Sequence, residues 1–143
     1  MTIEPRISLV FNGECDAAFT LYRQCLGGTV TRLTWGDSPM ADQAPADWRD
    51  KILHATLTVG ATAFSGGDVL PGAYETPQGF QLQLDLDDVA AAERIFTRLA
   101  DGGQITVALQ QTFWAQRFGA VVDRFGIPWG INCGEGQAAS TEG

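Results

Sequence analysis

Residues 11–31, FNGECDAAFTLYRQCLGGTVT, align without a gap with residues 86–106, LDDVAAAERIFTRLADGGQIT, at an offset of 75. In both stretches a strand-like run gives way to apolar residues spaced three and four apart, which is typical of an amphipathic helix. A Gly-Gly pair then ends each helical pattern, and Arg23 aligns with Arg98. The chain therefore repeats one strand–helix–strand segment.

The flanking sequence extends each repeat into the same series of elements. In the first repeat, β-branched and apolar runs predict strands around a helix at 14–26, and these strands are residues 5–11, 29–35, 51–59 and 61–66. In the second repeat, Asp87 is the predicted N-cap of a helix that ends before Gly102, and the predicted strands are residues 80–86, 105–109, 114–122 and 127–133.

Two tandem βαβββ units of this kind predict an α+β fold. Neither unit carries enough apolar surface to bury alone, so we expect the strands of both to curl around a shared cleft. We expect a single domain at residues 1–134, with unit one at 5–68 and unit two at 79–133. The small and polar residues 135–143 predict a disordered tail.

Composition and charge exclude several classes of function. The 143 residues are 45% hydrophobic and 18% charged, as expected for one soluble domain. Nine Lys and Arg against 17 Asp and Glu give a net charge of −8, which excludes nucleic-acid binding and attachment to anionic membranes. No signal peptide or membrane span is predicted, so we expect a cytoplasmic protein. The three cysteines lack CxxC spacing and are expected to be buried thiols.

Three stretches carry a resemblance to a known superfamily. They are LVFNGECDAAFTLYRQCLGG, KILHATLTVG and GGQITVALQQTFWAQRFGAVVDRFGIPWGIN. These stretches resemble the vicinal oxygen chelate superfamily, which includes glyoxalase I, bleomycin-resistance proteins and extradiol dioxygenases. The order of motifs in the third stretch is most similar to the PhnB-like branch. The resemblance spans Ile7 to Cys133 and implies a homodimer with small-molecule sites. The methyltransferase label that PhnB-like proteins often carry does not follow, because no glycine-rich strand-to-helix loop is present to hold an S-adenosyl group.

The resemblance also locates the positions where metal-dependent relatives place their ligands. Those relatives hold a divalent ion with His and Glu side chains from the first and fourth strands of each unit. The matching positions here are Ile7 or Ser8, Phe64 or Ser65, Gln81, and Gly130. None of these residues has an ionised oxygen or an imidazole, so we expect no divalent metal and no other cofactor.

His54 is the only histidine and the candidate catalytic residue. It lies in a predicted strand with Ile52, Thr56 and Thr58 on its own, more polar face. An imidazole there can transfer a proton near neutral pH or donate a hydrogen bond to a ligand. The alternative is a structural histidine that is hydrogen-bonded to a neighbouring strand or to a dimer partner.

Aromatic residues of the second unit are candidate ligand contacts. Trp114 and Phe118 can form the wall of an apolar site, although Trp114 is equally compatible with a core position. Trp129 shares its face with Ile127 and Ile131, so we expect it in the core.

Charged residues near these strands have structural explanations. Asp123 is expected to stabilise its own turn, and Arg117 is expected to pair with a carboxylate such as that of Asp123 rather than with an anionic ligand. Asp68 is expected in a glycine-rich loop, where a carboxylate can serve either the turn or a ligand.

These observations favour metal-independent binding of a small molecule in the cleft. The predicted ligand-binding residues are Trp114, Phe118, Gln81, Ser65, Ser8 and Asp68, with His54 beside them. One alternative is a lyase or isomerase, glyoxalase-like or dioxygenase-like, in which His54 transfers a proton or binds a metal, with help from Asp68. Another is a dimeric interaction module whose cleft is filled by its own side chains. The sequence leaves open whether the protein is an enzyme.

Overall fold

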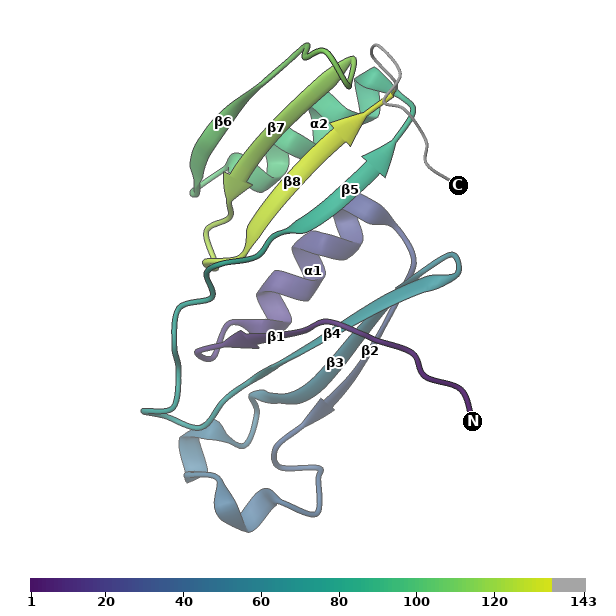
Figure 1. Cartoon of the computed structure of the whole chain (residues 1–143). Coiled ribbons are helices and arrows are strands. Elements are labelled where there is room, and N and C mark those ends of the chain that lie inside the picture. Colours follow the sequence, from purple (N-terminus) through teal and green to yellow (C-terminus); the bar gives the residue numbers. More distant parts are fainter. Residues whose placement is uncertain (135–143) are drawn as a thin grey trace. The chain divides into compact units, whose positions relative to one another are not determined.

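The computed structural model describes residues 1–134, which fall into two compact units (Figure 1). Unit 1 comprises Met1–Thr76, and unit 2 begins at Pro77. The predicted tail at 135–143 lies outside the described residues. Within residues 1–134 there is no helix with the length and hydropathy of a membrane span.

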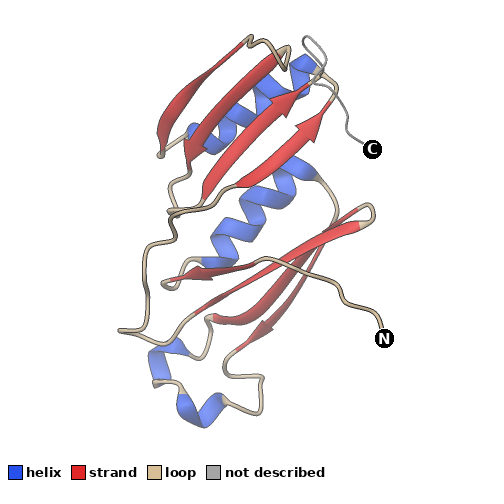
Figure 2. Cartoon of the chain, viewed as in Figure 1, coloured by secondary structure: helices blue, strands red, loops and turns tan. Residues whose placement is uncertain are grey.

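Unit 1 is a four-stranded sheet with one helix on one face (Figure 2). Its elements are β1 (Ser8–Phe11), α1 (Cys15–Leu26), β2 (Thr29–Thr34), two short 3-10 turns at Ala41–Gln43 and Ala46–Trp48, β3 (Ile52–Val59) and β4 (Thr62–Asp68). The strand order is β1-β4-β3-β2, in which β1 runs parallel to β4 and the other pairs are antiparallel.

Unit 2 repeats this arrangement. Its elements are β5 (Leu82–Leu86), α2 (Val89–Ala100), β6 (Gln104–Gln110), β7 (Arg117–Val122) and β8 (Pro128–Cys133). The strand order β5-β8-β7-β6 again has one parallel pair, between the first and last strands of the unit. The predicted α+β fold of tandem βαβββ units is therefore confirmed.

The apolar spacing of the two helices places them against their sheets. Phe19 of α1 is fully buried, with its ring 6.1 Å from that of Phe11 and 5.6 Å from that of Phe64. In α2 the buried residues Ala92, Phe96 and Leu99 belong to the predicted stripe. All three cysteines are buried and none forms a disulfide, as predicted.

The two glycines that follow each helix have the same structural roles in both units. Gly27 and Gly102 adopt φ values of 75° and 74°, a region that glycine enters without steric cost. A Cβ at Gly28 would overlap the carbonyl oxygen of Thr58, and a Cβ at Gly103 would overlap that of Val122. In each pair, the first glycine ends the helix and the second lets the next strand approach its neighbour.

Several predicted boundaries differ from the observed ones. The N-cap of α2 is Asp88, whose carboxylate accepts a hydrogen bond from the Ala90 amide at 3.2 Å, and not Asp87. β7 begins at Arg117 because residues 112–115 form a hydrogen-bonded turn. β4 extends to Asp68, which was predicted to lie in a loop.

A β-bulge in β3 changes the predicted face of Ile52. Leu33 of β2 pairs with His54 and the next residue, Thr34, pairs with Ile52, so Leu53 is the extra residue. Because a bulge breaks the alternation of side chains, Ile52 lies in the core at 3% exposure while His54 is exposed. The prediction that the two residues share a face was wrong for this reason.

Candidate functional site

Unit 1 carries a polar patch on the sheet face opposite α1. A Cβ at Gly66 would touch Phe19 of α1, so the residues on either side of Gly66 point to the other face. Ser65 is one of them, and it pairs with Ser8 of β1 and with Thr56 of β3. We call this patch, formed by Ser8, His54, Thr56 and Ser65, the His54 face.

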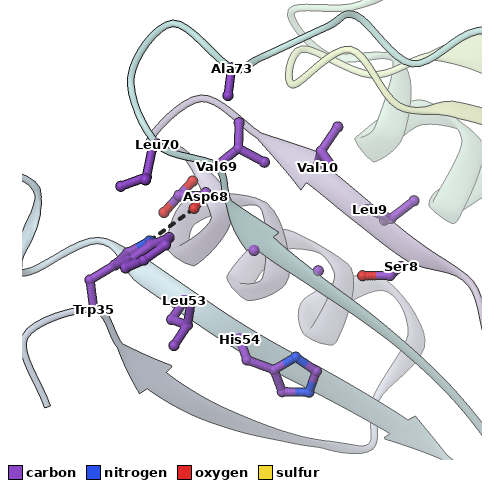
Figure 3. Close-up of a pocket in the computed structure, with 12 residues that line it drawn as sticks. Ser8, Leu9, Val10, Trp35, Leu53, His54, Asp68, Val69, Leu70 and Ala73 are labelled. Carbon is purple, nitrogen blue, oxygen red and sulfur yellow. Dashed lines mark hydrogen bonds between the residues drawn. The ribbon is translucent and has the colours of Figure 1, made fainter. Parts of the chain in front are cut away.

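A cavity of about 350 Å³ adjoins this face (Figure 3). Its apolar wall includes Val10, Trp35, Leu53, Val69 and Leu70. Its polar lining includes Ser8 and His54, and the glycines at 66 and 67 expose backbone to it. The bulge lets the adjacent Leu53 and His54 both line the cavity.

His54 belongs to a chain of hydrogen-bonding side chains. Its Nε2 lies 3.1 Å from Thr56 Oγ1, which in turn lies 3.1 Å from Ser65 Oγ. If the Thr56 hydroxyl donates to Nε2, then Nδ1 of a neutral ring carries the proton and is a donor. If Nε2 donates to Thr56, then Nδ1 is an acceptor. The ring can therefore serve a ligand in either role.

Asp68 stabilises the wall of the cavity by accepting hydrogen bonds from the backbone. Its Oδ1 accepts hydrogen bonds from the amides of Gly13 at 2.8 Å and Cys15 at 3.0 Å, and its Oδ2 accepts one from Ile52 at 2.9 Å. Its carbonyl oxygen accepts a fourth, from the Trp35 indole at 2.9 Å (Figure 3). The side chain is 2% exposed and joins β4, β3 and the start of α1, so it shapes the cavity wall.

Cys15 is close to this carboxylate but is not a nucleophile. Burial raises the pKa of its thiol, and the neighbouring carboxylates of Asp68 and Asp16 raise it further. Burial also raises the pKa of Cys133. Because only the thiolate is reactive, both residues are packing groups.

Unit 2 carries an aromatic and polar patch on the sheet face opposite α2. A Cβ at Gly119 would touch Phe96 of α2, so Phe118 points to the other face, where it pairs with Asn132. Asn132 also pairs with Asp85, and Gln83 lies two residues before Asp85 on the same strand. Together with Phe113 and Trp114, whose rings adjoin Phe118, we call these residues the Trp114 face.

The predicted residues of unit 2 lie on or beside this face. The Trp114 side chain is 38% exposed, and its ring centroid is 5.3 Å from that of Phe118. Gln81 lies against Gly130, where a Cβ would be 2.5 Å from its Nε2.

Three polar residues of the Trp114 face were missed by the sequence reading, namely Gln83, Asp85 and Asn132. The alternation of β5 and β8 contains the signal that assigns them to one face. Thr56 of the His54 face was recognised as a neighbour of His54 but not as its hydrogen-bond partner.

Other predictions for unit 2 have clear outcomes. Trp129 is in the core at 1% exposure, as predicted. Asp123 stabilises its turn by accepting from the amides of Phe125 and Ile127, and it also accepts from the Trp129 indole. Arg117 pairs with a carboxylate, as predicted, but its partner is Glu93 of α2, at 3.7 Å, and not Asp123.

Comparisons with known proteins identify the family. Residues 4–132 match the model of the 3-demethylubiquinone-9 3-methyltransferase family. Protein YjdN of Escherichia coli strain K12 is 34% identical over 141 residues, covering 92% of this chain and 95% of YjdN. The chain belongs to this PhnB-like family.

Several solved structures have a similar fold. Protein PA1353 from Pseudomonas aeruginosa has a TM-score of 0.85 and 45% identity, over 93% of this chain and 98% of PA1353. A putative 3-demethylubiquinone-9 3-methyltransferase, PhnB protein, from Bacillus cereus has a TM-score of 0.74 and 18% identity, over 92% and 99% of the two chains. A glyoxylase/bleomycin resistance protein/dioxygenase domain from Frankia sp. EAN1pec has a TM-score of 0.63 and 15% identity, over 94% and 99%. The last two comparisons show the shared fold.

The donor set does not fit the divalent metal of glyoxalase-like relatives. The sequence left a choice between Phe64 and Ser65 and between Ile7 and Ser8 for the ligand positions of unit 1. Phe64 packs against α1, and Ser65 pairs with Ser8, so the positions are those of Ser8 and Ser65. In unit 2 the same register pairs Gln83 with Gly130, so Gln83 and not Gln81 is the equivalent of Ser8. At these positions the two serines offer hydroxyls, Gln83 offers a neutral amide, and Gly130 has no side chain. No three His, Cys, Asp or Glu residues within 1–134 are grouped to hold an ion.

The residues also do not fit the S-adenosyl cofactor that the family description implies. A glycine-rich turn between a parallel strand and a helix normally holds such a group. The strand-to-helix connections are residues 12–14 in unit 1 and residues 87–88 in unit 2, and Gly13 is their only glycine. We derive no methyl transfer from this site.

Proposed function

We propose that this PhnB-like chain binds a small molecule without a metal, with the cavity of unit 1 as a ligand site. The observation that carries the proposal is the composition of this cavity, in which an apolar wall meets Ser8 and His54. His54 is in turn hydrogen-bonded to Thr56, and Thr56 to Ser65. Small-molecule sites typically combine an apolar lining with a few polar groups that fix orientation.

Each predicted residue of unit 1 has a role in this proposal. His54 and Ser8 supply hydrogen bonds to the ligand, and Ser65 orients Thr56 and, through it, His54. Asp68 holds the wall and does not contact the ligand through its carboxylate, since both oxygens accept backbone hydrogen bonds.

In unit 2, Trp114, Phe118 and Gln81 are proposed as a second group of ligand contacts. The exposed aromatic surface of Trp114 beside Phe118 supports this role. The proposal also keeps two expectations from the sequence, a homodimer, which the resemblance implies, and a cytoplasmic location. Light scattering of the purified protein and cell fractionation test them.

Thermal-shift screening of a metabolite panel, followed by calorimetry on the hits, tests the function. A ligand that binds only the folded protein raises the melting temperature. We expect His54→Gln and Thr56→Val to weaken binding at the cavity about tenfold, which corresponds to the loss of one good hydrogen bond. Thr58→Val is the matched control, because Thr58 is exposed on the same strand and, unlike Thr56, is not hydrogen-bonded to His54.

Elemental analysis of untagged protein, purified without chelator, tests metal independence. Stoichiometric divalent metal would overturn this part of the proposal. If no hit responds to His54→Gln or Thr56→Val, the cavity is not the ligand site.

A second candidate function is a lyase or isomerase in which His54 transfers a proton. The position of His54 at the cavity, with Thr56 as a hydrogen-bond partner, favours this candidate. Asp68 does not assist, because its carboxylate is already engaged by the backbone. Turnover of a bound hit that is lost in His54→Gln would establish an enzyme. A hit that binds without turnover leaves a binding protein.

A further inference from the structure

The Trp114 face presents three aromatic rings at wide angles to one another. The Phe113 and Trp114 rings are 4.7 Å apart with an interplanar angle of 81°, and the Trp114 and Phe118 rings are 5.3 Å apart at 63°. Phe113 is 74% exposed and Trp114 is 38% exposed. Aromatic rings set at wide angles, with ring faces exposed, are the groups that proteins use to bind alkylated ammonium ions.

A hydrogen-bonded chain connects these rings to a carboxylate. The Trp114 indole N–H donates to Asn132 Oδ1 at 3.1 Å, and Asn132 Nδ2 donates to Asp85 Oδ1 at 3.3 Å. An indole nitrogen can only donate, so Asn132 must turn its Oδ1 toward Trp114 and its Nδ2 toward Asp85. Gln83 Nε2 also donates to Asp85 Oδ1, at 3.0 Å. Both amides engage the same oxygen, which leaves Oδ2 without a donor from residues 1–134.

No cationic side chain neutralises this carboxylate in the described part of unit 2. Arg94 and Arg98 belong to α2, which covers the opposite face of the sheet. Arg117 pairs with Glu93 of α2, and Arg124 lies 4.8 Å above the Phe125 ring in the turn before β8.

The surroundings of Asp85 are also acidic. A cavity of about 490 Å³ is lined by Asp85 and Asn132 and includes the neighbouring Asp87. Two carboxylates repel an anionic ligand and attract a cation, and the net charge of −8 adds to both effects.

We propose that the Trp114 face is a binding site for an organic cation, such as an alkylated ammonium group attached to a planar ring. The rings of Trp114 and Phe118 contact the ligand, and Asp85 Oδ2 pairs with its charge. This inference rests on the proposed small-molecule binding and names the ligand class of its second group of contacts. Trp114 and Phe118 were expected to provide an aromatic wall, and Asp85 adds the selection for positive charge.

The indole N–H resonances of ¹⁵N-labelled protein test the proposal. The chain has four tryptophans, and Trp114→Phe assigns the Trp114 signal. The probe is benzyltrimethylammonium, with benzyl alcohol as the neutral control and phenylacetate as the anionic control. We expect the cation alone to shift the Trp114 signal saturably, with the buried Trp35 and Trp129 signals unchanged.

Charge variants identify the carboxylate. We expect Asp85→Asn to weaken binding of the cation about tenfold, because it removes the charge and retains the size of the side chain. Asp101→Asn removes the same charge from an exposed position after α2 and should leave the affinity unchanged. Phe118→Leu provides an independent test through the ring if Asp85→Asn fails to fold.

Three outcomes would overturn the inference. If benzyl alcohol or phenylacetate shifts the Trp114 signal as strongly as the cation, selection for cations is refuted while small-molecule binding by this face remains. If Asp85→Asn and Asp101→Asn weaken binding equally, the attraction is a general effect of net charge. If no probe shifts Trp114, the site is refuted, and the cavity beside His54 is judged by its own ligand screen.

Discussion

Replacing Asp68 by Asn should destabilise unit 1 more than any exposed Asp→Asn change. The carboxylate accepts backbone hydrogen bonds from Gly13, Cys15 and Ile52 at 2.8–3.0 Å and is 2% exposed. An amide oxygen can keep the first two bonds, but the amide nitrogen then faces the Ile52 N–H, donor against donor. The variant therefore keeps two weaker bonds and leaves one buried donor unsatisfied.

The magnitude follows from these three bonds. A bond to a charged acceptor contributes about 1.5–3 kcal/mol and a neutral one about 0.5–1.5 kcal/mol, so each retained bond loses about 1 kcal/mol. The unsatisfied Ile52 amide adds about 1–3 kcal/mol, and the easier desolvation of an amide offsets part of the total. We expect the free energy of unfolding to fall by about 2–4 kcal/mol, which lowers the melting temperature by about 5–15 °C in a chain of this size.

Chemical and thermal unfolding, followed by circular dichroism, measure this change. Asp42→Asn is the matched control, since Asp42 is exposed in the same unit, and it should change stability by less than about 0.5 kcal/mol. If Asp68→Asn is as stable as Asp42→Asn, the assignment of Asp68 as a structural carboxylate is refuted. A ligand role would then have to be reconsidered.

Two further predictions concern the same region. Gly67→Ala should destabilise the protein by several kcal/mol, because the added Cβ would overlap the carbonyl oxygen of Leu53 in the bulge; an unfolding midpoint equal to that of the parent would contradict this. Cys15 should resist alkylation in the folded protein, and stability should fall as the pH rises above the ordinary thiol pKa of 9.0, because the unfolded chain then loses a proton that the folded chain retains. The control is Cys15→Ala. If the free energy of unfolding of the parent does not fall relative to that of Cys15→Ala above this pH, the pKa of the thiol is not raised.

Local patterns predicted the elements and their order well. The helix stripes and the two Gly-Gly pairs depend on interactions between residues close in sequence, or on backbone conformations that only glycine adopts easily. In both pairs the second glycine also lies against the backbone of a neighbouring strand, at Thr58 in unit 1 and at Val122 in unit 2. This shared cause explains why the repeat was visible in a single sequence.

The candidate site was only partly predictable. His54 was identified because it is the only imidazole, and Trp114 and Phe118 because aromatic side chains commonly form the walls of apolar ligand sites. Asp68 was expected at a loop because a Gly-Gly-Asp sequence is typical of turns, but its carboxylate is held by the backbone of Gly13 and Cys15, more than 50 residues away in sequence. Such long-range acceptors leave no periodic signal.

The sequence by itself determined the tandem βαβββ fold, since helix stripes, strand runs and Gly-Gly pairs depend on short-range spacing. The expectation that polyanionic partners are excluded rests on composition and stays a prediction. Tertiary structure alone decided which side chains act together. The bulge at Leu53 separated Ile52 from His54, and sheet pairing brought Asn132 to Asp85 from 47 residues away. Register and hydrogen bonding between distant strands depend on the whole fold, so local sequence does not specify them.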